Sequence, residues 1–514
     1  MSSATKDIQL ARDAQRRQLS TPSSKSFSVT IQCSPIPDIL GDPIERRSFQ
    51  FFRCRTAPQL AGYFVSTFWD SLVPLATHYQ PAIRHAVVAL ASLHERFEKN
   101  DNSIHSSNYD IAQGGFALQQ YNRAISCLIQ PVAIGGQQEL DVSLVACILF
   151  ALFEILRGHY GSAVSHVQNG VKMLSSSEAG KDQQKSQPSP LVLSQAPCFS
   201  FESLKTIFAR LDYQSIQLTG GPPMSLNIDS ELSMPGFNAH IPACFTSLEE
   251  AQNSFHYHQN RLLKAINDLN DTATHSKSAI PVIEAAYLES YSQGRKAIRS
   301  VLEKWGSAFE AYLLKSTVNM SSKELLGAAV LNINHRIALL HTEKHGEDDL
   351  HKDLTKPISW DNLHRKCGEI IDLATSVIKL HNNSTDPTSE SRPLFSMDMT
   401  IVGPLFSIAH RCRDPKLRRR AIALLYSAQR QEGLWHSVLT ARVAEKIMNM
   451  EEAGLGEVKK GEDVPDTHRI HAIHVRFDME GRKGYLKLRR RQNTGQRLYI
   501  FEPVTEVLEE VIDW

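Results

Sequence analysis

Two histidines in the segment HTEKH are the first candidates for metal chemistry. His341 and His345 are four residues apart, so a helix would place both imidazoles on one face, as zinc-binding histidine pairs require. Glu343 does not stand where the base of an HExxH zinc site stands, and no third ligand is suggested nearby. We therefore interpret the pair as solvent-facing histidines at the end of a helix.

Three further histidines lie in the segment HRIHAIH. His468, His471 and His474 are spaced by three, and residues three apart in a strand point to opposite faces, so the first two imidazoles would converge only at a bend. A strand edge or loop is the interpretation that we prefer. Carboxylates show no spacing typical of an acid–base pair, and P-loop, GxGxxG and GxSxG patterns are absent. We expect no enzyme, no cofactor and no metal.

The cysteines are scattered along the chain without a close pair, at Cys33, Cys54, Cys127, Cys147, Cys198, Cys244, Cys367 and Cys412. The N-terminus has no apolar signal region, so this spacing favours a reducing compartment over a disulfide framework. Cys127 and Cys147 lie in apolar helical segments, where a free cysteine behaves as a small hydrophobic residue. Zinc binding through Cys-x2-Cys pairs has no support.

Two basic runs are candidates for phosphate contact or nuclear import. The run Arg411–Arg420 has Asp414 in its middle, and the denser run Arg482–Arg491 interleaves Tyr485 and Leu488. The candidate basic patch of the second run consists of Arg482, Lys483, Lys487, Arg489, Arg490 and Arg491. The alternative, which we prefer, is a solvated helix start for the first run and the exposed face of a hairpin for the second.

Bulk composition is that of an ordinary globular protein of 514 residues, with 42% hydrophobic, 22% charged and 8% aromatic residues. Lys plus Arg number 56 and Asp plus Glu number 55, so a formal net charge of +1 gives no general case for nucleic-acid binding. The most apolar run, 142–156, is shorter than the roughly 20 residues that a membrane span needs and contains Glu154. We expect a buried helix there and no membrane contact.

Apolar periodicity predicts an all-α fold made of many helices in two subdomains. A polar, disordered arm is expected over 1–50 and the first subdomain over 51–174, followed by a Ser/Gln/Pro linker over 175–200 and the second subdomain over 201–453. Helices are expected at 57–75, 81–97, 112–130, 141–158, 160–174, 201–219, 247–269, 281–314, 322–343, 361–381, 396–411 and 415–450.

The last segment, 454–514, breaks this pattern. A charged loop is followed by two alternating runs around Glu480–Gly481, which predict a small β-hairpin near 470–500. The run RLYIFEPV is a candidate third strand, and we expect a short helix at the C-terminus.

Several segments together resemble the regulatory region of fungal zinc-cluster (Zn2Cys6) transcription factors, and they cover about 46–514. These are an opening pair containing QPAIRHAVVALASLHE, the segment SLVACILFALFEILRGHYGSAVSHVQNGVKML, the segment FARLDYQSIQL, and the segment CRDPKLRRRAIALLYSAQRQEGLWHS. The matching positions, which we expect to be structural, are Arg84, His85, Cys412, Arg413, Asp414, Arg430, Glu432, Gly433 and Trp435.

The sequence departs from the family in its DNA-binding module. The family's module holds two zinc ions with six cysteines, arranged as Cys-x2-Cys-x6-Cys repeated once near the N-terminus, whereas the first fifty residues here contain only Cys33. The resemblance therefore implies nuclear transcription regulation through other regulators or a homodimer partner, without direct DNA binding by this chain alone. Either the gene model lacks an upstream exon or the protein is a cluster-less regulator. The alternative from another class is a helical ligand-binding or scaffold protein.

Overall fold

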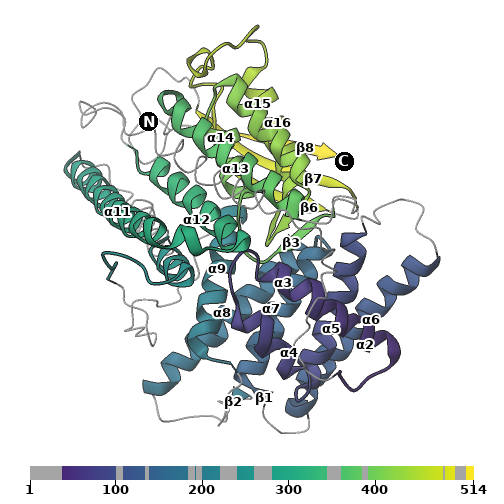
Figure 1. The fold of residues 1–514 in the computed structure, drawn as a ribbon. Helices are drawn as coiled ribbons and strands as arrows, with labels where there is room; N and C mark the ends of the chain where they lie inside the picture. The colour runs from purple at the N-terminus through teal and green to yellow at the C-terminus, as the bar shows by residue number, and fades with distance from the viewer. Residues whose placement is uncertain are drawn as a thin grey trace, which may run out of the picture.

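The structure, a computed structural model, describes residues 38–99, 108–133, 138–182, 191–192, 199–219, 240–259, 281–343, 360–384, 392–478, 481–491 and 505–513. Over these ranges most elements are helices, with a small three-stranded sheet close to the C-terminus (Figure 1). The predicted fold class, mostly α with a small β element, is confirmed.

The first helix begins inside the arm that we expected to be disordered. Helix α2 (Pro43–Phe51) starts at a capping box, in which the Asp42 carboxylate accepts from the amides of Ile44 and Glu45, both at 2.8 Å. Pro43 fits the first turn because no hydrogen bond from its nitrogen is needed there. The expectation was therefore wrong for residues 43–50, and residues 1–37 lie outside the described part of the chain.

The single helix predicted over 57–75 is broken in two. A π-helical turn η1 (Phe52–Thr56) leads into α3 (Ala57–Leu60), and a second, η2 (Phe68–Leu72), leads into α4 (Val73–Ala76). Gly62 between them has φ +61°, a left-handed conformation that glycine adopts at little cost. Because the chain turns there, the apolar residues on either side reach the core from two short helices.

Four longer helices complete the N-terminal half: α5 (Pro81–Glu98), α6 (Asn108–Ala133), α7 (Leu140–Leu156) and α8 (Tyr160–Asp182). The predicted central helix is α7, which is buried along almost its whole length. Helix α8 continues into the predicted linker. Two residues of that linker form β2 (Leu191–Val192), which pairs in parallel with β1 (Gln138–Glu139).

The C-terminal half is a second group of helices. It contains α9 (Phe201–Thr219), a helix over 248–259, α11 (Pro281–Ser316), η3 (Thr317–Asn319), α12 (Ser322–His341), η4 (Asp361–Leu363) and α13 (His364–Ser384). The helix predicted from 396 begins only at α14 (Val402–Arg411), because β3 (Leu394–Ser396) precedes it and pairs with a later strand.

The long helix predicted over 415–450 is also divided. Helix α15 (Pro415–Ala428) ends at Gln429, whose φ of +43° is left-handed. A tight hairpin of β4 (Arg430–Glu432) and β5 (Trp435–His436) follows, turning at Gly433 with φ +51°, before α16 (Ser437–Glu452) begins. Strand β4 lies between β3 and β5 in a three-stranded sheet.

The last elements are η5 (Gly461–Asp463) and the strands β6 (Ile470–Asp478), β7 (Lys483–Arg491) and β8 (Thr505–Asp513). The predicted hairpin is β6–β7, and β8 adds a third antiparallel strand beside β7. The expected C-terminal helix is therefore wrong. Leu508 and Ile512, four residues apart, fit one helix face equally well, but both pack in the small core beneath the sheet. The candidate strand at 497–504 lies outside the described residues.

One core joins both halves of the molecule. A single cluster of buried hydrophobic residues extends from Ile39 to Met448, and a smaller cluster lies between α16 and the β6–β8 sheet. In Figure 1, α16 lies across the sheet formed by the last strands. Among the described helices, none is long and apolar enough to cross a membrane.

Candidate functional site

The segment Cys412–Trp435, which carries the family-like motif, connects α14, α15 and the β4–β5 hairpin. Asp414 starts α15, because its carboxylate accepts from the amides of Lys416 and Leu417, both at 3.0 Å. Pro415 occupies the first helical position. The polar start of this segment therefore determines where α15 begins.

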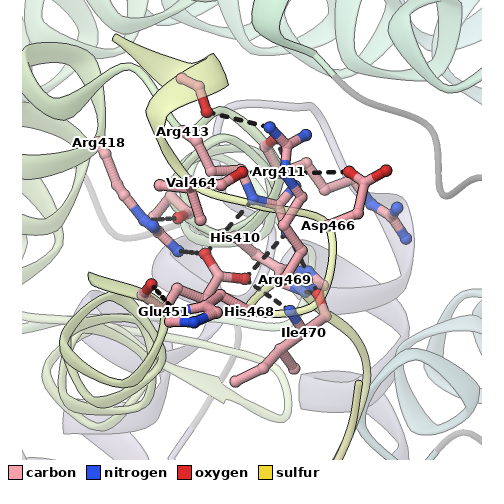
Figure 2. Close-up of polar contacts among 12 residues, drawn as sticks. His410, Arg411, Arg413, Arg418, Glu451, Val464, Asp466, His468, Arg469 and Ile470 are labelled. Carbon is pink, nitrogen blue, oxygen red and sulfur yellow. Dashed lines mark hydrogen bonds and ion pairs between the residues drawn. The ribbon is translucent and has the colours of Figure 1, made fainter. Parts of the chain in front are cut away.

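The centre of the site is a carboxylate from outside that segment, Glu451 on α16 (Figure 2). It accepts hydrogen bonds from Arg413 Nη2 at 3.0 Å and from Arg418 Nη2 at 2.7 Å. The amide of Ile470, at the start of β6, donates to it at 2.7 Å. Arg418 Nε also donates to the Ala409 carbonyl at 2.8 Å. One carboxylate thus links α14, α15, α16 and the sheet.

All three charged groups of this cluster are shielded from solvent. Glu451 and Arg418 are 0% exposed and Arg413 is 3% exposed. Burial alone would raise the pKa of Glu451, but the charges of Arg413 and Arg418 hold it below its ordinary value. Burial lowers the pKa of Arg418, against the attraction of Glu451. Removing one member would leave an uncompensated buried charge, which costs about 3–5 kcal/mol.

Two arginines of the first basic run are therefore part of the core. Our interpretation of Arg411–Arg420 as a solvated helix start was wrong for Arg413 and Arg418, which face Glu451. Arg419 and Arg420 are exposed, and they form ion pairs with Glu452 and, at 2.6 Å, with Asp372. Four arginines of the run thus bind acids of the same chain.

Two histidines of the cluster each donate a hydrogen bond to a backbone carbonyl. His410 Nε2 lies 3.0 Å from the Ile470 carbonyl and His468 Nδ1 lies 3.1 Å from the Glu451 carbonyl, so each nitrogen is the donor. Burial, with Arg411 and Arg413 adding repulsion, holds the pKa of His410 well below its usual range. His410 is therefore neutral at physiological pH.

A second buried carboxylate, that of Glu432 on β4, caps the N-terminus of α14. It accepts from the amides of Thr400 at 2.7 Å, Ile401 at 3.0 Å and Val402 at 3.0 Å, and from the Thr400 hydroxyl. A negative charge at a helix N-terminus is favourable because the amides there have no partner within the helix. Arg430, 2% exposed, lies 3.7 Å from Glu432 and donates to the Tyr63 hydroxyl at 3.1 Å. This pair joins β4 to the N-terminal half.

Gly433 and Trp435 complete the hairpin. A Cβ on Gly433 would lie 1.8 Å from Gln214 Oε1, so only glycine fits beside α9 there. Gln214 accepts from the Leu434 amide at 3.0 Å and donates to the Met397 carbonyl at 2.9 Å. Trp435 is buried with its ring 5.4 Å from that of Phe406. The glycine thus permits α9 to bind the hairpin directly.

The N-terminal motif positions lie elsewhere, on α5. His85 Nδ1 is 2.6 Å from Gln120 Oε1, whose amide nitrogen donates to Glu45 at 2.7 Å. Arg123 also binds Glu45, at 3.2 Å. Arg84 is half-buried. These two motif residues are thus not brought together with the Glu432 and Glu451 clusters.

The described residues offer no group of three or more His, Cys, Asp or Glu side chains that could hold a metal ion. His341 is half-buried, with its ring 5.1 Å from that of Trp360, so our expectation that it faces solvent was wrong. Burial, together with the positive charge of Arg411, lowers the pKa of His341 to about 3. His345 lies outside the described residues, as does the side chain of His471. Cys412 is fully buried.

The candidate basic patch forms the middle strand of the last sheet. Lys483, Lys487 and Arg489 are exposed on one face of β7, and Arg482 is exposed in the preceding turn. Arg490 is half-buried and binds Glu506 on β8 at 2.6 Å. Arg491 ends β7, opposite Thr505. Strand β7 is hydrogen-bonded to β6 on one side and to β8 on the other. Its backbone is therefore not available to a receptor that binds basic segments as extended peptides.

The acceptor at the centre of the site, Glu451, was not predicted from the sequence, although a signal was present. Val443, Ile447 and Glu451 follow one another at spacings of four, so the buried stripe of α16 ends on a carboxylate. A charge on an apolar stripe requires a buried partner of opposite charge. The partners Arg413 and Arg418 lie more than thirty positions earlier.

The family model for the fungal specific transcription factor domain matches residues 56–448, from α3 through the hairpin and into α16. The chain belongs to this family.

Two curated relatives share sequence with the chain. It is 23% identical over 561 aligned residues to the aspercryptin biosynthesis cluster-specific transcription regulator atnN of Emericella nidulans, covering 93% of this chain and 83% of the relative. It is 31% identical over 96 residues to the transcription regulator lscL of Purpureocillium lilacinum, covering 18% of this chain and 23% of the relative. No solved structure matches the chain significantly. Family and relatives together support a role in transcription regulation.

Proposed function

We propose that the chain is a non-enzymatic regulator that acts in the nucleus through contacts with other proteins. The observation that carries this proposal is the family match over residues 56–448, which spans the helical body. Within that body the motif residues Glu432, Arg413 and Arg430 are buried and bonded to the same chain. Their contacts support a role in holding the body together, which leaves the surface for partners.

DNA contact in this proposal comes from a partner. The eight cysteines include no Cys-x2-Cys spacing, and the first basic run is bonded to acids of the same chain. The name of the relative from Emericella nidulans points to genes of one biosynthetic cluster as the class of target.

A tethering experiment tests regulatory action directly. The full chain is fused to a heterologous DNA-binding domain, and a reporter with the matching operator is measured in a fungal host. We expect a change of at least several-fold relative to the DNA-binding domain alone. An unchanged reporter at equal fusion abundance would contradict the proposal and favour a scaffold without a role in transcription.

Location and partnership need a second experiment. A fluorescent fusion expressed from the native promoter should accumulate in the nucleus, and the tagged chain should co-purify with a zinc-cluster factor. Deleting the gene should then lower or raise transcripts of one neighbouring set of genes. A cytoplasmic fusion together with an unchanged transcriptome would refute the nuclear role.

A further inference from the structure

The outward face of β7 and β8 carries its side chains in matched rows. Directly opposite residues of an antiparallel pair share a face. The register pairs Lys483 with Asp513, Tyr485 with Val511, Lys487 with Glu509 and Arg489 with Val507. Leu486 and Leu488, which alternate with these residues on β7, are buried on the opposite face. The four rows therefore point away from α16 and the core.

These rows are open to solvent within the described part of the chain. All the charged members are exposed, and Val507 and Val511 are 45% and 46% exposed. Tyr485 is half-buried, with the guanidinium of Arg476 over its ring at 4.5 Å. Val511 lies opposite Tyr485, and the Lys487–Glu509 row separates this apolar pair from Val507, so apolar and charged rows alternate across the face.

We propose that this face, residues 483–489 of β7 and 507–513 of β8, binds the same face of a second copy of the chain. The charges are arranged so that the face complements itself. A two-fold axis parallel to the strands, midway between β7 and β8, would lay β7 of one copy over β8 of the other. The β7 residue of each row then faces the β8 residue of the same row in the second copy, so that Lys487 faces Glu509 of the second copy.

The same operation places Lys483 against Asp513 of the second copy and Tyr485 against Val511. Opposite charges thus meet at two rows, and an aromatic–aliphatic contact lies between them. Three basic and two acidic side chains share the face, namely Lys483, Lys487, Arg489, Glu509 and Asp513. Its charge is therefore close to balanced, which suits a second copy better than it suits phosphate.

The geometry of sheets sets the strength of this contact. Sheets twist, so the match is best at the central rows of Tyr485 and Lys487 and weaker at the ends. Two strands of seven residues cover about 10 Å by 25 Å. That footprint is smaller than a standard interface, so we expect a weak dimer that forms in the micromolar range and depends on concentration. This inference concerns the isolated chain and does not depend on the proposed regulatory role.

Complementary charge variants test the proposal. In a homodimer of Lys487→Glu, acid would face acid, and in a homodimer of Glu509→Lys, base would face base. In a mixed dimer of the two variants each new charge faces its opposite, although the like-charge pair inside each sheet persists. Sedimentation velocity of the full chain, from about 1 µM to about 300 µM, measures the association.

We expect the wild-type chain to shift from monomer to dimer over this range. Each single variant should dimerise at least tenfold more weakly, and the equimolar mixture should recover dimers at the wild-type concentration. A wild-type chain that stays monomeric, a single variant that dimerises normally, or a mixture that stays monomeric would each overturn the proposal.

A further variant covers the case in which the single charge variants fail to fold, as judged by circular dichroism. Val511→Ser removes the apolar contact of the central row without creating a like-charge pair, and we expect dimerisation to weaken at least threefold. The matched control is Val318→Ser, because Val318 is 78% exposed and lies after α11, away from the sheet. Equal dimerisation of these two variants would contradict the assignment of the face.

Discussion

Replacement of Glu451 by glutamine should destabilise the protein more than almost any other single change of a charged residue. The glutamine keeps the size of the side chain but removes the charge that Arg413 and Arg418 share at 3.0 and 2.7 Å. Both arginines are at most 3% exposed, so water cannot replace the lost partner. Breaking a buried ion pair from one side costs about 3–5 kcal/mol. Since folded proteins are stable by about 5–15 kcal/mol, the loss would be about a fifth of the total or more.

Thermal unfolding followed by circular dichroism measures this effect, and for a chain of 514 residues we expect the transition to fall by about 3–5 °C. The control is Glu303→Gln on α11, whose carboxylate is 56% exposed and pairs with Arg299 at 2.8 Å. A surface ion pair of this kind contributes at most about 1 kcal/mol. If the two variants unfolded at the same temperature, the buried cluster would not stabilise the fold as its geometry indicates.

The remaining predictions concern the second carboxylate, the hairpin turn and acid. Glu432→Ala leaves three buried amides at the start of α14 without an acceptor and should cost at least about 3 kcal/mol in chemical denaturation. Gly433→Ala combines a left-handed backbone with a clash against Gln214, and should cost more than the roughly 1–2 kcal/mol of the backbone alone. Burial, together with the positive charge of Arg55, lowers the pKa of His94 to about 3. Burial alone lowers the pKa of His436 to about 4. Because unfolding lets each take up a proton below its ordinary pKa of about 6.5, lowering the pH to 5.5 should remove about 1.4 kcal/mol of stability per histidine.

Matched controls separate these effects from general fragility. Gly115→Ala is the control for the glycine, because its added Cβ would meet no atom within 4 Å, and we expect it to leave stability unchanged or raised. For the acid effect, His436→Gln should show a shallower loss of stability between pH 7 and pH 5.5 than the wild-type chain. A parallel pH profile would mean that His436 takes up its proton at the same pH in the folded and in the unfolded chain, which would contradict the effect of its burial.

The periodicity of the sequence predicted most helices, because amphipathic helices identify themselves locally. The helix predictions were wrong where the chain turns without an obvious break in its pattern of hydrophobic residues. In the segment 57–75 the apolar spacing continues across Gly62, and within 415–450 it continues across Gln429 and Gly433. Left-handed residues at these positions redirect the chain, although one of them, Gln429, is not a residue type that usually marks a turn.

The sequence identified the motif residues of the site but not the residues that bind them. The motif led us to expect structural roles for Arg413, Arg430 and Glu432, and the structure buries all three. Their partners were not accessible to this reasoning, because the bonds from Arg413 to Glu451 and from Arg430 to Tyr63 span 38 and 367 positions. Spacing along a chain predicts neighbours within a helix or hairpin, whereas such contacts depend on how whole elements pack.

The bond between Arg430 and Tyr63 also has a consequence for how the protein is made. A ribosome adding about 5–20 residues per second needs about 20–70 s to pass from one residue to the other. During that interval the N-terminal helices have been synthesised, but β4, which completes their packing against Tyr63, has not. Apolar surface of the nascent chain would then be accessible to chaperones for most of its synthesis. A premature stop codon before β4 should therefore cause degradation of the whole polypeptide.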